Sequence, residues 1–172
     1  DIEILFTVSE ETYGTGAAAF DASVIRSREA YVPDFDGVHG QVVIAAPTIL
    51  TFCAEISGKA SHAGFAPEQG ISAILTAARV IDGLKSGRVS ADLTLNIGKI
   101  KGGLLTNIVP DACTVEGEIR GGEHAAALDC LRLTERAFQR ACDEFGARLR
   151  FESKCLVTAY HTPEDAPVVS RY

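Results

Sequence analysis

The sequence predicts an α+β fold, and three observations favour it. From residue 48 onward, four segments alternate apolar and polar residues with period two, which is typical of strands with one covered face. Two segments with apolar residues at helical spacing lie between these strands. The resulting order, β-α-β-β-α-β, predicts a ferredoxin-like domain, in which both helices cover one face of a four-stranded antiparallel sheet.

The four expected strands have their apolar residues on one face. In the first, Leu50, Phe52 and Ile56 point the same way, and in the third Val115 and Ile119 do so. The fourth strand is weaker and buries fewer side chains. The strands are expected at residues 49–57, 91–100, 112–120 and 148–157.

Both expected helices carry an apolar stripe. The first covers residues 67–85, with Pro67 in its first turn, where a missing N–H costs nothing. The second covers residues 123–145 and ends at Gly146, a residue suited to a left-handed C-cap. The stripes consist of Ile71, Ile74, Ala77, Ala78, Ile81 and Leu84 in the first helix, and Ala127, Leu131, Phe138, Ala141 and Phe145 in the second.

The segment before Pro47 has a different pattern. Its apolar runs at residues 2–8 and 41–46 are continuous, which predicts strands covered on both faces, as in a parallel α/β sheet. A helix capped by Thr15 is expected at 15–27. We therefore expect three parts: an α/β fragment at 1–47, the ferredoxin-like domain at 48–159, and a return segment toward the α/β domain at 160–172.

Composition narrows the function classes. The net charge of −7 argues against binding to nucleic acid, which needs a basic face. No apolar run approaches the roughly 20 residues of a membrane span. The five scattered cysteines form no CxxC pair and are expected to be free thiols, three of them buried, in a reducing cytoplasm. Because the sequence starts inside an apolar run without methionine, we expect a piece of a longer protein.

Several polar residues could carry chemistry, although each also has an ordinary structural explanation. Glu10 and Glu11 follow a buried strand, where α/β sheets bind ligands, but such pairs are also common in solvated loops. One of two adjacent carboxylates can ligate a metal while the other acts as a base. Asp36 precedes Gly37 in a turn and is either a ligand or a turn former, with Asp34 as the alternative ligand.

Three further candidates lie in the ferredoxin-like domain. His62 stands among small residues in a loop between a strand and a helix, where it is either a solvated side chain or a catalytic one. Asn107 sits in a tight connection after Gly102 and Gly103 and is either a turn former or a substrate ligand. Arg120 ends a strand on the face away from the core, where it is either a surface residue or a bidentate clamp for a carboxylate.

Four collinear runs resemble the co-catalytic zinc peptidase family that includes peptidase T, the aminoacylases, the carboxypeptidase G type enzymes and several dipeptidases. The likeness is to its peptidase T-like branch. The runs are FTVSEETYGTGAAAFD at 6–21, FDG at 35–37, GKASHAGFAPEQGISAI at 58–74 and NIGKIKGGLLTNIVPDACTVEGEIRG at 96–121.

The resemblance implies a role for each candidate. Glu10 matches the general base that activates a metal-bridging water, and Glu11 and Asp36 match ligands of the two zinc ions. His62 matches a histidine of the lid domain that polarises the scissile carbonyl, in dimeric members by reaching into the partner's site. Asn107 and Arg120 match lid residues that hold the substrate backbone and its terminal carboxylate.

The resemblance also implies what this chain lacks. The family's upstream HxD segment, its bridging aspartate and its late histidine have no counterpart here. We therefore expect a lid, or dimerisation, domain with one rim of the active site, inactive by itself, from a cytoplasmic homodimer that cleaves short peptides. The alternatives are an N-acyl amino acid amidohydrolase of the same family and a non-enzymatic ferredoxin-like module for dimerisation or ligand binding.

Overall fold

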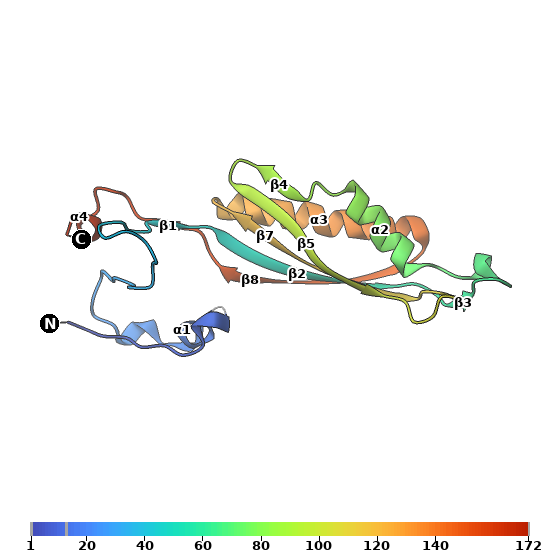
Figure 1. Cartoon of the computed structure of the whole chain (residues 1–172), viewed down its shortest axis with the longest axis horizontal. Coiled ribbons are helices and arrows are strands. Elements are labelled where there is room, and N and C mark those ends of the chain that lie inside the picture. Colours follow the sequence, from blue (N-terminus) through green and yellow to red (C-terminus); the bar gives the residue numbers. More distant parts are fainter. Residues whose placement is uncertain (1, 13, 172) are drawn as a thin grey trace. The chain divides into compact units, whose positions relative to one another are not determined.

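The structure is a computed structural model that describes residues 2–12 and 14–171. Its chain divides into two compact units, one of residues 45–160 and one of residues 1–44 with 161–172. The larger unit contains the sheet and the two long helices (Figure 1). Among the described residues, no helix combines the length and apolar character needed to cross a bilayer.

The larger unit has the predicted ferredoxin-like architecture. Its five strands lie in the order β4-β5-β7-β2-β8, and each neighbouring pair is antiparallel. Helices α2 and α3 cover one face of this sheet (Figure 1). The strands are β2 Thr48–Ser57, β4 Gly87–Ser90, β5 Leu93–Gly102, β7 Ala112–Gly121 and β8 Arg148–Val157, and the helices are α2 Ala73–Gly83 and α3 His124–Phe145.

The core lies between the sheet and the helices, as the alternation predicted. Leu50 and Phe52 on β2 are almost fully buried, as is Ile119 on β7. The ring of Phe138 on α3 lies 6.4 Å from that of Phe52 and 6.1 Å from that of Phe151 on β8, centroid to centroid. These three aromatic rings hold α3 against the centre of the sheet.

Two details of the larger unit differ from prediction. The edge strand β4 was not predicted, although it forms a hairpin with β5. The first helix begins at Ala73 rather than at residue 67, because the Ser72 hydroxyl accepts a hydrogen bond from the Leu75 N–H and caps the helix there. Residues Pro67–Gln69 form a separate 3-10 turn, η3.

The predicted end of α3 is confirmed, since Gly146 follows it with φ of 73°. Cys113, Cys130 and Cys142 are buried free thiols, as expected, and burial raises the pKa of each. Their position in the core explains their presence without any chemical role.

The predicted strand at residues 2–8 is wrong. These residues pair with no other strand among those described, and Ile2 and Phe6 are about nine-tenths exposed. A strand requires a neighbour for its backbone hydrogen bonds, and apolar composition does not supply one. The predicted strand at 41–46 is reduced to β1 (Ala45–Ala46), which pairs with β9 (Tyr160–His161).

The predicted helix at 15–27 is also wrong in length. The helix found there, α1 (Thr15–Ala19), stops at Ala19 because Phe20 adopts an extended backbone. The Asp21 carboxylate then caps a separate 3-10 turn, η2 (Ala22–Val24), by accepting from the Ser23 N–H. A short helix that the sequence did not predict, α4 (Pro167–Ser170), lies near the end of the chain.

A carboxylate holds the N-terminal segment in place of strand pairing. Glu3 accepts hydrogen bonds from the Ser27 hydroxyl and from the backbone N–H groups of Arg26 and Ser27. The hydroxyl of Ser27, followed by the two backbone N–H groups, lowers the pKa of Glu3. One ionised side chain therefore links two stretches of the smaller unit.

Thr48 joins three elements at the base of the larger unit. Its side chain is fully buried, and its Oγ1 accepts a hydrogen bond from the Ala159 N–H at 2.8 Å. The same oxygen lies 3.0 Å from Nδ1 of His124, the first residue of α3. The first residue of β2 is thus tied both to α3 and to the segment that follows β8.

Substitution of Gly117 by alanine is expected to lower the free energy of unfolding by about 2–3 kcal/mol, because it overfills the sheet–helix interface. A Cβ at Gly117 would lie 2.4 Å from Cζ of Phe52 and 2.5 Å from the backbone oxygen of Asn96. Gly98→Ala is the control, since a Cβ there would lie 3.7 Å from Nδ2 of Asn96 and 3.9 Å from the backbone oxygen of Glu116. Urea denaturation measures both, and equal shifts would contradict the expectation.

Candidate active-site rim

Two very short strands bring two of the predicted site residues together. Strand β3 (Ser61–His62) pairs with β6 (Ile108–Val109), and His62 lies opposite Ile108. The Ala63 N–H donates to the backbone oxygen of Asn107 at 2.9 Å. His62 and Asn107, far apart in the sequence, therefore lie side by side on one extension of the larger unit, near β3 in Figure 1.

Glycines permit the close approach that builds this extension. A Cβ at Gly70 would lie 2.4 Å from Oγ of Ser61, and one at Gly58 would lie 2.0 Å from the backbone oxygen of Ile71. Beside Gly58, the two backbone segments are also joined by a pair of hydrogen bonds of 3.0 and 2.9 Å between Lys59 and Ile71. Any side chain at these glycines would push the His62 segment away from its neighbours.

The imidazole of His62 is exposed and oriented. Its Nδ1 accepts a hydrogen bond from the Gly64 N–H at 3.1 Å, and its ring lies 4.4 Å from that of Phe65, centroid to centroid. Because Nδ1 is an acceptor, this geometry assigns the ring proton to Nε2. The side chain therefore presents an N–H donor to solvent, which is what a developing oxyanion requires.

Arg120 lies at the other end of the domain. It stands near the end of the 10-residue strand β7, which is roughly 30 Å long, whereas β3 and β6 adjoin the start of that strand. Its Nε and Nη2 contact the carboxylate of Glu118 at 2.6 and 3.3 Å. Within one chain, Arg120 is thus not brought to His62 and Asn107.

The predicted acidic residues are in the smaller unit. Glu10 and Glu11 begin the 3-10 turn η1 (Glu10–Thr12) and are exposed. Ser9, immediately before them, has φ of 60°, a backbone conformation that non-glycine residues rarely adopt. The Gly14 N–H closes the turn by donating to the Glu10 oxygen at 2.9 Å. Asp36 is exposed in an irregular segment.

These residues do not amount to a complete metal site. Within residues 2–12 and 14–171, no group of three or more His, Cys, Asp and Glu side chains could hold a metal ion. A zinc site needs at least three protein ligands, and Glu11 and Asp36 supply two carboxylates at most. The described part of this chain therefore does not fit a zinc ion by itself.

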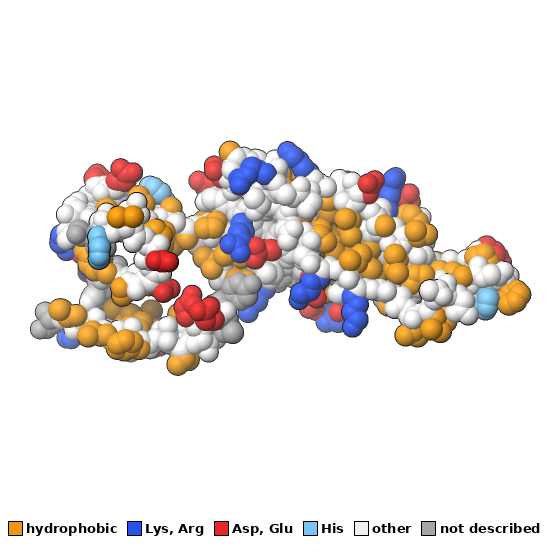
Figure 2. Space-filling model, in the orientation of Figure 1, with side chains coloured by type: hydrophobic (Ala, Val, Ile, Leu, Met, Phe, Trp, Pro, Cys, Tyr) orange, Lys and Arg blue, Asp and Glu red, His pale blue; other side chains and the backbone are white. Residues whose placement is uncertain are grey.

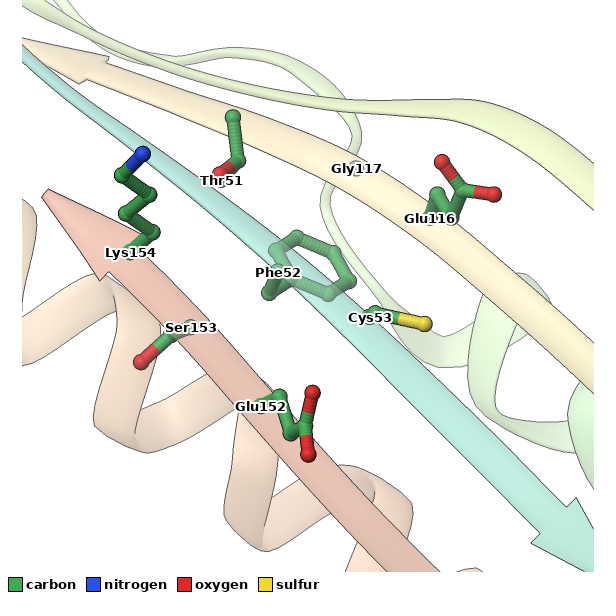
Figure 3. Close-up of a pocket in the computed structure, with 8 residues that line it drawn as sticks. All are labelled: Thr51, Phe52, Cys53, Glu116, Gly117, Glu152, Ser153 and Lys154. Atoms are coloured by element: carbon green, nitrogen blue, oxygen red, sulfur yellow. The ribbon is translucent and has the colours of Figure 1, made fainter. Parts of the chain in front are cut away.

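A shallow groove on the uncovered face of the sheet contains none of the predicted site residues. Figure 3 shows Cys53 of β2 in this groove, with Glu116 of β7 and Glu152 of β8 on either side. Burial, and then the nearby carboxylates of Glu55, Glu116 and Glu152, raise the pKa of Cys53. The thiol stays protonated near neutral pH, so the groove offers no cysteine nucleophile.

Comparison with known proteins identifies the larger unit. Residues 44–145 match the family described as the peptidase dimerisation domain. The protein YqjE of Bacillus subtilis is 36% identical over 168 residues, which are 98% of this chain and 45% of YqjE.

Two solved structures are similar over nearly the whole chain. The aminopeptidase PepT of Bacillus cereus has a TM-score of 0.89 and 35% identity, and a tripeptidase of Staphylococcus aureus has a TM-score of 0.91 and 30% identity. Each match covers 95% of this chain and 44% of the solved chain. The chain thus spans less than half the length of these relatives.

Proposed function

Because this chain belongs to the peptidase dimerisation domain family, we propose that it forms the lid and one rim of the active site of a zinc-dependent peptidase. The intact protein would hydrolyse short peptides, and the other metal ligands would come from outside this chain. The observation that carries the proposal is the pairing of β3 with β6, which holds His62 and Asn107 together as two exposed polar groups. The names of the similar PepT and tripeptidase structures support the substrate class.

The separation of the site residues supports a homodimer in which two copies build each site. His62 and Asn107 lie at one end of the larger unit and Arg120 at the other, so a single lid cannot bring all three to one substrate. A partner copy that supplies His62 and Asn107 removes this difficulty. The side chain of Leu75 on α2 is exposed, and it offers an apolar surface for such an association.

Each residue then has a defined task. His62 donates its Nε2–H to the oxygen of the scissile carbonyl and stabilises the negative charge that develops there. Glu10 accepts a proton from the attacking water. Arg120 exchanges the Glu118 carboxylate for the terminal carboxylate of the substrate, which its guanidinium can hold in the same bidentate manner. Glu11 and Asp36, together with ligands from outside this chain, would hold zinc, whose charge would supply Lewis-acid polarisation.

The test is hydrolysis of a tripeptide by the full-length gene product before and after removal of metal with a chelator. We expect zinc-dependent hydrolysis by the full-length protein and none by residues 1–172 alone. Hydrolysis of N-acyl amino acids but not of peptides would favour the amidohydrolase alternative. Failure to hydrolyse either class with zinc present would refute the proposal and leave a non-enzymatic dimerisation module.

A further inference from the structure

One large apolar side chain beside His62 is left in water. Phe65 is 86% exposed, and its ring leans on the imidazole at 4.4 Å with an angle of 42° between the ring planes. An exposed phenylalanine forgoes the stabilisation that burial of its apolar surface would provide. Apart from this ring contact, folding of the described chain gives Phe65 little burial, so its apolar surface is open to a ligand.

The backbone fixes Phe65 to His62. The backbone N–H groups of Phe65 and Ala66 both donate to the backbone oxygen of His62, at 3.3 and 3.0 Å. These hydrogen bonds close a tight backbone turn that begins at His62. The 3-10 turn η3 follows with Pro67 at its start. Any surface that the His62 ring approaches is therefore approached by the Phe65 ring as well.

The neighbouring loop also exposes apolar side chains. Leu104 and Leu105, which precede Asn107 on the connection from β5 to β6, are 87% and 59% exposed. Figure 2 shows hydrophobic side chains near a histidine at the end of the molecule where Figure 1 labels β3. The polar groups of His62 and Asn107 thus occur in an apolar setting, the usual composition of a site that binds an apolar group in a fixed orientation.

We propose that Phe65 is a specificity-determining residue, which binds the apolar side chain of the substrate residue that supplies the scissile carbonyl. This inference rests on the proposed function of His62. A carbonyl oxygen that accepts from Nε2 lies about 3 Å from that atom, and the side chain on the same residue is only a few bonds away. Since the Phe65 ring contacts the imidazole, it is the apolar surface that this side chain meets.

The experiment compares two tripeptides with the full-length protein, one with leucine and one with glycine at the residue that supplies the scissile carbonyl. The quantity measured is the ratio of their kcat/KM values, which cancels any loss common to both substrates. We expect Phe65→Ala to lower the preference for leucine about ten-fold, mainly through KM, and Phe65→Leu to retain most of it. Leu133→Ala, which removes an exposed apolar side chain on α3, should leave the ratio unchanged.

An unchanged ratio in Phe65→Ala would overturn the inference. A ratio that changes only when the substrates vary on the leaving-group side of the scissile bond would also overturn it. So would a loss of dimer in sedimentation with the ratio unchanged, because Phe65 would then be a contact between copies. His62→Ala distinguishes the proposed role of His62 from that of Phe65. If it leaves hydrolysis of both peptides at full rate, the proposed role of His62 fails; if it abolishes both, the Phe65 result judges the subsite alone.

Discussion

Replacement of His62 by alanine in the full-length protein is expected to lower kcat for a tripeptide by about 100- to 1,000-fold, because one preoriented oxyanion donor is lost. The Gly64 N–H holds Nδ1, which leaves the Nε2–H for the substrate in the proposed mechanism. KM should change much less, since the hydrogen bond strengthens only as negative charge develops on the carbonyl oxygen. Steady-state kinetics of the full-length protein with added zinc measures both parameters.

Two controls accompany this variant. His161→Ala removes an exposed histidine from β9, outside the proposed site, and should retain the parental kcat. His62→Gln keeps a side-chain N–H donor and should recover part of the lost rate. A His62→Ala enzyme with normal kcat, or one with a raised KM alone, would contradict a role in stabilising the transition state.

Replacement of Phe138 by alanine is expected to lower the free energy of unfolding by about 3–5 kcal/mol. Its ring is fully buried and contacts Phe52 and Phe151, so truncation leaves a cavity between α3 and the sheet. Because small domains are stable by only about 5–15 kcal/mol in total, this loss is a large fraction of the whole. Urea denaturation followed by far-UV circular dichroism measures it.

The matched control is Leu133→Ala on the same helix. Leu133 is 62% exposed, so its truncation should change the free energy of unfolding by no more than about 0.5 kcal/mol. Similar losses in the two variants would mean that burial of Phe138 does not set the cost, since alanine favours a helix at both positions. The three-ring cluster would then not hold α3 to the sheet.

The central strands could be predicted because their signal is local. A strand with one covered face alternates along its own sequence, and the predicted fourth strand coincides with β8, Arg148–Val157. The continuous apolar run at residues 2–8 lacks such a signature of register. Its conformation depends on a partner strand, and the described chain provides none, so the prediction failed there.

The site required contacts between distant segments. The sequence marked His62 and Asn107 separately, but their adjacency depends on β3 and β6, which are too short to show any period. The hydrogen bond from Gly64 that orients the imidazole could not be predicted either, because tertiary geometry sets the orientation of a side chain. The assigned roles of Glu10, Glu11, Asp36, Asn107 and Arg120 remain predictions, to be checked by substitution in the intact enzyme.

The chain enters the larger unit after Ile44 and leaves it before Thr162, and these two places lie together. Strands β1 and β9 pair there, and the Thr162 N–H donates to the Ile44 oxygen at 2.7 Å. A tight turn joining those two residues could replace everything between them without changing the path of the flanking chain. The domain can therefore be added or removed as one piece while the flanking chain keeps its path.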